Sequence, residues 1–137
     1  MNNKGFTIIE VLATITIIAL FAIIVTPNVY KSVNNAKKDR YIADAKEMIS
    51  KARYRKSMKK YKYLFNEENN CNAISLKNLG VFKMQNPDKG YYDTDQSGVM
   101  ICLENDEYKY YIKLISNKGR SINNYTNIEE LTRANIN

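Results

Sequence analysis

The chain has 137 residues, of which 21 are Lys or Arg and 14 are Asp or Glu, so its formal net charge is +7. This length allows one domain rather than two. The absence of histidine excludes a His-ligated metal and a His general base, and with them most hydrolase triads and catalytic zinc sites. The scattered Ser, Asp and Lys residues suggest no triad either, so we do not expect an enzyme.

An apolar stretch, Phe6 to Val25, begins close to the N-terminus. Its polar residues are Thr7, Glu10, Thr14 and Thr16. A helix of this length spans about 30 Å, the thickness of the hydrocarbon core of a bilayer. A cleavable secretory signal is the alternative, but the preceding segment holds a single lysine and no small-residue cleavage site follows the stretch. We therefore expect residues 6–26 to remain in the mature protein as a membrane-spanning helix.

Helical periodicity resumes after Pro27, which we expect to kink the helix rather than end it. Apolar and small residues then recur on one helix face up to about Met58. They are Val29, Val33, Ala36, Tyr41, Ile42, Ala45, Met48, Ile49 and Ala52. Residues 27–62 are therefore predicted to form the amphipathic half of the same helix.

A basic tract lies at the end of this predicted helix. Residues 51–62 contain seven basic residues and no acidic one, namely Lys51, Arg53, Arg55, Lys56, Lys59, Lys60 and Lys62. Interleaved tyrosines make the tract a candidate site for nucleic acid or another anionic polymer. The alternative is a solvated face whose cations stabilise a helix C-terminus.

Residues 63–137 are predicted to form a head with an antiparallel sheet. Two β-rich runs, 98–105 and 107–115, flank a short turn at Asn105 and Asp106 and predict a hairpin. Residues 89–94 are expected to add a third strand, and residues 74–83 a short helical turn closed by Gly80. The predicted fold class is α+β: a long kinked N-terminal helix with a small antiparallel sheet packed on its distal half.

Two further features of the head lead to separate predictions. Thr126 and Glu129 have the spacing of a capping box, which predicts a short last helix. Cys71 and Cys102 form no C-x-x-C motif. If the head lies outside the cell, one disulfide between them is the simplest pairing, and we favour it. The alternative is two free thiols that pack as small buried hydrophobes.

Residues 93–104 match the spacing of an EF-hand calcium loop. The candidate ligands are Asp93, Asp95, Ser97 and Glu104. The context does not fit, because no helix is predicted before the loop and a β-rich run follows it. We therefore favour a β-turn that leads into a strand, and we expect no cofactor.

The stretch KGFTIIEVLATITII resembles the N-terminal signature of type IV prepilins and of the related pseudopilins of secretion and competence systems. Several elements occur in register: a short leader with a lysine, a glycine just before Phe6, a glutamate four residues after Phe6, and an unbroken apolar helix. Pro27 falls where many members of the family have a proline. The motif covers about the first 27 residues, and the long helix followed by a small sheet extends the resemblance in architecture.

The resemblance implies a role for each residue of the motif. Residues 1–5 would be a leader that a prepilin peptidase cuts between Gly5 and Phe6, and Phe6 would then be N-methylated. Glu10 would be the assembly glutamate, which meets the new α-amino group of a neighbouring subunit inside the filament. The alternative is an ordinary membrane anchor that tolerates Glu10 near the headgroups.

The function that the resemblance implies is a structural subunit of a type IV pilus, a filament for motility, adhesion or DNA uptake. Its partners would be other pilin subunits, the peptidase/N-methyltransferase, the inner-membrane assembly platform, and the membrane before assembly. DNA or a host surface would be further candidates. The protein would pass from a single-pass membrane form to the extracellular pilus.

Two other functions stay open at this point. One is a pseudopilin of a type II secretion or competence machine, and the other is a membrane-anchored binding protein that uses residues 51–62. The positive-inside rule opposes an external head, because Lys4 precedes the apolar stretch while Lys31, Lys37, Lys38 and Arg40 follow it. We follow the motif, since these later cations belong to a helix that forms part of a folded domain rather than to a short loop.

Overall fold

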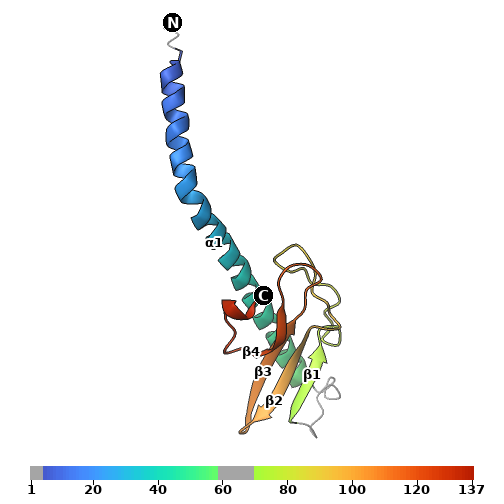
Figure 1. The fold of residues 1–137 in the computed structure, drawn as a ribbon. Coiled ribbons are helices and arrows are strands. Elements are labelled where there is room, and N and C mark those ends of the chain that lie inside the picture. The colour runs from blue at the N-terminus through green and yellow to red at the C-terminus, as the bar shows by residue number, and fades with distance from the viewer. Residues whose placement is uncertain (1–4, 59–69) are drawn as a thin grey trace. The chain divides into compact units, whose positions relative to one another are not determined.

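The structure is a computed structural model, and it describes residues 5–58 and 70–137. The chain divides into two compact units, Met1–Ala36 and Lys37–Asn137. Helix α1 (Ile8–Ser57) begins in the first unit and ends in the second (Figure 1). In the first unit α1 has no other element beside it, whereas in the second unit it forms part of a folded head.

In the first unit α1 exposes every residue from its start to Val33. Ile, Leu, Val and Phe make up most of this surface between Ile8 and Val25, so this part of the helix needs an apolar environment. Of the described residues, only α1 forms a helix that is long and apolar enough to cross a membrane. The helix continues through Pro27, and a bend at that residue stays a prediction.

In the second unit α1 buries one face against the head. Its buried residues are Tyr41, Asp44, Ala45, Met48, Ile49 and Ala52. The predicted apolar face is therefore confirmed from Tyr41 to Ala52, whereas Val29, Val33 and Ala36 are exposed. The helix ends at Ser57 instead of continuing to residue 62, and residues 59–62 lie outside the described part of the chain.

The head contains four strands, β1 (Cys71–Ser75), β2 (Gly98–Glu104), β3 (Glu107–Leu114) and β4 (Ile122–Asn127). They form one antiparallel sheet in the order β1-β2-β3-β4. The predicted hairpin is confirmed as β2 and β3. Asn105 and Asp106 connect them with φ angles of 52° and 63°. Both φ angles are positive, as the type I′ turn of a two-residue hairpin loop requires.

The predicted third strand at residues 89–94 is wrong. This segment makes only two isolated bridges, between Gln85 and Tyr91 and between Tyr92 and Ser116. Lys89 has a φ of 64°, which belongs to a turn rather than a strand. Asp93 then accepts hydrogen bonds from the backbone amides of the next residues, at Asp95 and Gln96, and turns the chain again.

The predicted last helix is also displaced. Thr126 lies in β4 and starts no helix. A single 3₁₀ turn follows at Arg133–Asn135, and there Thr132 and Asn135 provide the cap, with 2.8 Å from the Thr132 amide to the Asn135 side-chain oxygen. The helical turn expected at residues 74–83 shares its first two residues with β1, and a hydrogen-bonded turn at residues 76–80 ends at Gly80 with a φ of 75°.

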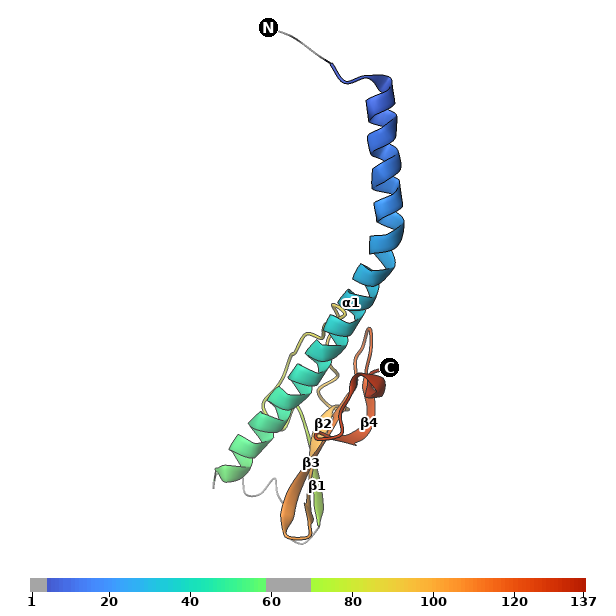
Figure 2. The same ribbon diagram turned by 90° about the vertical axis from the view of Figure 1, so that its left-hand side faces the viewer.

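The core lies between one face of the sheet and the distal part of α1, which runs along that face in both views (Figures 1 and 2). Strand alternation places Ile74, Val99 and Ile112 in register on the inner face, where α1 contributes Met48 and Ala45 to the same cluster. On the opposite face, Met100, Tyr111 and Lys113 are half-buried and Cys102 is buried. The fold is therefore α+β, with an antiparallel sheet packed on the distal half of a long helix, as predicted.

Candidate functional site

The segment before α1 presents the Gly5–Phe6 bond in the open. Residues 5–7 precede the helix, and the Phe6 side chain is 85% exposed. No heavy atom lies within 4 Å of the position that a Cβ on Gly5 would occupy. Among the residues that the structure describes, nothing in the fold therefore requires glycine at position 5. A requirement for glycine there would have to come from a partner that binds the segment.

Thr7 and Glu10 form a capping box at the start of α1. The Glu10 carboxylate accepts hydrogen bonds from the Thr7 amide (2.8 Å) and the Thr7 hydroxyl (2.9 Å). The Glu10 amide donates to the Thr7 hydroxyl oxygen at 3.3 Å. Because α1 begins at Ile8, Thr7 is the N-cap and Glu10 is the third helical residue, the spacing that this motif requires. The box holds the carboxylate of Glu10 at the first turn and satisfies two backbone amides.

The sequence had singled out Glu10 but not its partner. The pattern T-x-x-E at residues 7–10 is the sequence signal that indicates Thr7 as this partner. The charge of Glu10 also lies at the positive end of the helix dipole, where an anion is favourable. The structure therefore explains how an isolated chain tolerates this carboxylate.

Polar side chains elsewhere in the apolar stretch bond to the helix itself. Thr14 and Thr16 donate to the carbonyl oxygens of Val11 and Leu12, each at 2.8 Å. Near Pro27, Thr26 donates to Ala22 at 2.6 Å and Asn28 to Ile24 at 3.1 Å. Each of these donors therefore has a partner without water or a second chain.

Most of the described basic tract faces the head. Lys51 pairs with Glu47 one turn earlier, at 3.0 Å. The Arg53 guanidinium lies 4.4 Å from the centre of the Tyr110 ring, and Lys56 lies over Tyr108.

Two further contacts extend this arrangement. A Cβ on Gly80 would come within 2.5 Å of the Arg55 guanidinium, so Arg55 packs closely against that turn. Burial lowers the pKa of Lys56. Arg53 and Lys56 thus hold the end of α1 to β3, while Lys59, Lys60 and Lys62 lie outside the described residues.

The four candidate calcium ligands do not come together. Asp95 forms an ion pair with Lys77 at 3.1 Å, and Asp93 accepts backbone hydrogen bonds. The Ser97 hydroxyl is bonded to the backbone of Ile115. Glu104 is at the far end of β2, about 20 Å along the strand from its start. Within the described ranges, no three acidic, Cys or His side chains form a group that could hold a metal ion.

Cys71 and Cys102 are joined by a disulfide. They are direct partners in the register of β1 and β2, with 4.0 Å between their Cα atoms. The bond therefore ties the first residue of the edge strand β1 to the central strand β2.

A second set of interactions, which the sequence did not suggest, joins α1 to the loops of the head. The Asp88 carboxylate accepts hydrogen bonds from Lys37 (3.1 Å), Tyr41 (3.2 Å) and Arg120 (3.0 Å). Burial alone would raise the pKa of Asp88, but these hydrogen bonds outweigh it and lower the pKa. A cluster of this kind, built from residues 32 to 51 positions apart, leaves no local pattern in a sequence.

Residues 1–26 match the family model of the prokaryotic N-terminal methylation motif. This match confirms the resemblance, because the motif is the hallmark of type IV pilins and pseudopilins. It indicates a structural rather than an enzymatic protein. No curated protein and no solved structure matches the chain.

Proposed function

We propose that this pilin-like chain is the structural subunit of a type IV pilus and that it polymerises through α1 into a surface filament. The single observation that carries the proposal is the N-terminal methylation motif of residues 1–26. The exposed apolar surface of α1 supports it, because such a surface is stable only in a bilayer or against other apolar helices. A filament core built of these helices would cover it.

The proposed processing step uses the exposed segment before α1. A prepilin peptidase would cut the Gly5–Phe6 bond, and a methyl group would be added to the new amine of Phe6. The openness of this segment supports access by an enzyme, since residues 5–7 lie outside the helix. The motif itself implies the peptidase as a partner.

The proposed assembly step uses the charge of Glu10. Once Phe6 is the N-terminus, a subunit has one cation and one anion four residues apart at the start of α1. In a staggered bundle, Glu10 of one subunit would pair with the Phe6 amine of the next. Low dielectric strengthens this pair and makes an unpaired carboxylate costly, so the pair would fix the register of the helices. Before assembly, Thr7 would hold the carboxylate at the helix start.

The proposed location changes during assembly. The apolar helix would first anchor the chain in the membrane, where the inner-membrane assembly platform would collect it. The disulfide between Cys71 and Cys102 supports an external head, because disulfides persist in oxidising compartments. The excess of cations after the apolar stretch favours a cytoplasmic head instead, by the positive-inside rule.

A pseudopilin of a secretion or competence machine is the second candidate, because the methylation motif is shared by both groups. It would use the same processing and pairing but would form a short rod. A membrane-anchored protein that binds polyanions through residues 51–62 receives less support. Three of its described cations, Lys51, Arg53 and Lys56, already contact groups of the chain itself.

The test is the mass of the intact protein and of its N-terminal peptide after shearing from the cell surface. We expect a chain that begins at N-methylated Phe6 in the sheared fraction. The same chain found only in membranes would favour the pseudopilin. A wild-type chain that retains residues 1–5 would contradict both and leave the membrane anchor.

The Glu10→Ala variant tests the pairing. We expect it to be cleaved and yet to be missing from the sheared fraction. Glu10→Asp serves as the control, because it keeps the charge on a shorter side chain. Normal filaments from Glu10→Ala would contradict the role of charge.

A further inference from the structure

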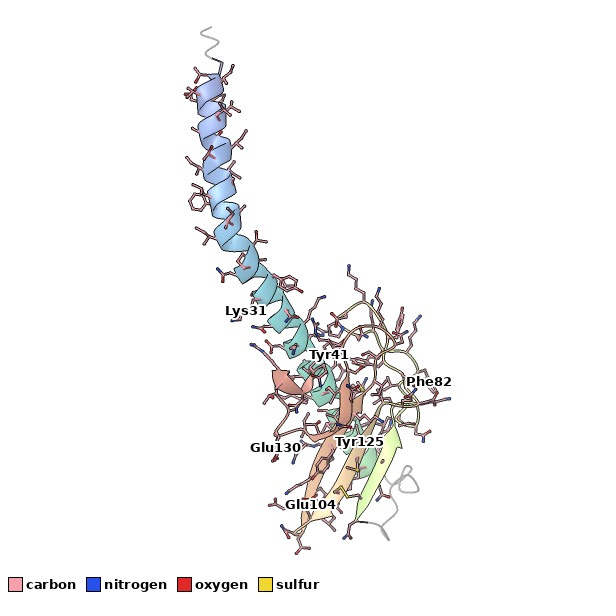
Figure 3. The ribbon with its side chains drawn as sticks, in the orientation of Figure 1. Lys31, Tyr41, Phe82, Glu104, Tyr125 and Glu130 are labelled. Carbon is pink, nitrogen blue, oxygen red and sulfur yellow. A yellow bond between two sulfur atoms is a disulfide. The ribbon has the colours of Figure 1, made fainter. Side chains whose placement is uncertain are left out.

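The heads carry two different exposed surfaces on opposite flanks. Near the β1 edge, the segment between β1 and β2 exposes Phe82 and Lys83, and Tyr91 lies beside them in the fold. Beyond the β4 edge, Glu129 and Glu130 are exposed. Figure 3 labels Phe82 and Glu130, which lie on opposite sides of the head. We call these surfaces the aromatic–cationic flank (Phe82, Lys83, Tyr91) and the acidic flank (Glu129, Glu130).

The aromatic–cationic flank forms no ion pair with a carboxylate of the described residues. Phe82 is 77% exposed, more than any other large apolar side chain described in the head. The Lys83 ammonium lies 4.7 Å from the centre of the Tyr91 ring, and no described carboxylate forms an ion pair with it. Aromatic residues are enriched at protein interfaces, and this flank offers a second molecule both apolar area and a cation that no described carboxylate pairs with.

The acidic flank carries the charge opposite to that of the aromatic–cationic flank. Neither Glu129 nor Glu130 has an ion pair among the residues that the structure describes. Lys109 interacts with Glu129 through space, but its ammonium is bonded to Glu104 at 3.0 Å. The two glutamates therefore keep their capacity to pair with a cation from another molecule.

We infer that, in the filament, the aromatic–cationic flank of one copy docks on the acidic flank of the next. The inference rests on the proposed function, and it adds a contact between heads to the contact between helices. An open filament needs a heterologous contact, in which one surface meets a different surface of its neighbour. Two complementary surfaces on opposite flanks of one head satisfy this condition, whereas two like surfaces would close a dimer. Lys83 pairs with Glu130 or Glu129, and Phe82 supplies apolar area beside the pair.

Charge reversal tests the contact in assembled filaments of the full chain. We expect Lys83→Glu and Glu130→Lys each to lower the yield of sheared filament about fivefold, the effect of losing one modest ion pair. The combined variant K83E/E130K restores the pair with its direction reversed and should recover the yield. K83E/E107K is the matched control, because it has the same net charge but places the new cation at the hairpin turn. Equal yields from the two double variants would overturn the contact.

A zero-length carbodiimide provides an independent readout that does not depend on yield. It joins a lysine amine to a carboxylate in direct contact, and Phe82, the residue before Lys83, lies on the opposite side of the head from Glu130 (Figure 3). We expect wild-type filaments to give a peptide that links Lys83 to Glu129 or Glu130 of another chain. Filaments that form without this link would overturn the contact and leave the proposed function intact. A processed wild-type chain that forms no filament would overturn both.

Folding is checked in the same variants. All three substituted residues, Lys83, Glu107 and Glu130, are exposed, so each variant should unfold in detergent at the wild-type temperature. Phe82→Ser is a further variant that leaves every charge in place. We expect it to lower the filament yield without changing its dependence on salt, whereas the loss caused by Lys83→Glu should shrink at high salt.

Discussion

Tyr92 and Asp44 are joined by a buried hydrogen bond, in which the Tyr92 hydroxyl donates to the carboxylate at 2.9 Å. The two residues are 48 positions apart and are 3% and 4% exposed. Asp44 also forms an ion pair with Arg40 one turn earlier on α1, at 3.3 Å. This contact fixes the loop before β2 against the buried face of the helix.

Removal of the Tyr92 hydroxyl should lower the free energy of unfolding more than removal of the Asp44 charge. Tyr92→Phe leaves one oxygen of a buried carboxylate unpaired, and we expect it to lower the free energy of unfolding by about 1–3 kcal/mol. Asp44→Asn keeps an acceptor for Tyr92 and removes the buried charge, so we expect a smaller loss at neutral pH. Urea unfolding of the full chain in detergent, followed by circular dichroism, measures both. Equal losses of unfolding free energy in the two variants would contradict a free-energy cost of burying the Asp44 charge.

Asp44 and Asp88 should give opposite dependences of stability on pH. Burial raises the pKa of Asp44 above 3.8, and the hydrogen bond from Tyr92 offsets only part of this. The contribution of Asp44 is therefore complete at pH values below 3.8 and is lost as the pH rises through the raised pKa. Asp88 has a lowered pKa, so its contribution is present above 3.8 and is lost as the pH falls through the lowered value.

The two variants separate these effects. Asp88→Asn should lose the acid-dependent part of the unfolding free energy and be less stable by about 1–3 kcal/mol at neutral pH, because Lys37 and Arg120 lose a charged partner. Asp44→Asn should lose the decline that begins above 3.8. Unfolding free energies from about pH 2 to about pH 7 measure both slopes. The same slope in Asp88→Asn and in the wild type would contradict the assignment.

The disulfide should stabilise the head alone. It closes a loop with a sequence separation of 31, for which chain entropy predicts about 2–4 kcal/mol. We expect Cys71→Ser with Cys102→Ser to lower the unfolding temperature of the head and to leave the helix signal of the first unit unchanged. A reductant should lower the wild-type temperature to the same value. No response to the reductant would mean that the sheet is held without the bond.

Substitutions at Gly5 should affect processing and not folding. The surroundings of Gly5 are open, so Gly5→Ala should have the circular dichroism spectrum of the wild type. We nevertheless expect Gly5→Ala to accumulate as an uncleaved precursor in membranes, because the proposed peptidase must bind this segment closely. Mass spectrometry of the membrane fraction measures the uncleaved share. Complete cleavage of Gly5→Ala would show that the peptidase accepts a side chain at this position.

The sequence predicted the elements whose signal is local. The apolar helix and the hairpin at Asn105 and Asp106 each depend on a pattern within one short segment. The edge strands β1 and β4 were missed, because CNAIS and INNYTN are short and mostly polar and are ordered by pairing with their neighbours. Residues 89–94 have the composition of a strand, but Lys89 and Asp93 turn the chain at both ends.

The functional residues also divide into those with a local sequence signal and those that depend on distant contacts. The spacing of Gly5, Phe6 and Glu10 is a fixed sequence signature, so the sequence alone is sufficient to predict the motif. Asp44 was missed because a single acid in an apolar face carries no spacing signal, and its partner Tyr92 lies on a distant loop. The cation–π contacts of Arg53 and Lys56 depend on β3, so the basic tract alone could not indicate that these cations pack on the sheet.

The hydroxyl groups of Thr14, Thr16 and Thr26 donate to carbonyl oxygens of their own helix. None of these three bonds depends on what surrounds the chain. The helix could therefore leave one apolar environment, enter another and return without any of them breaking. For the proposed function, this means that a subunit would keep these three hydrogen bonds both in the membrane and in the filament.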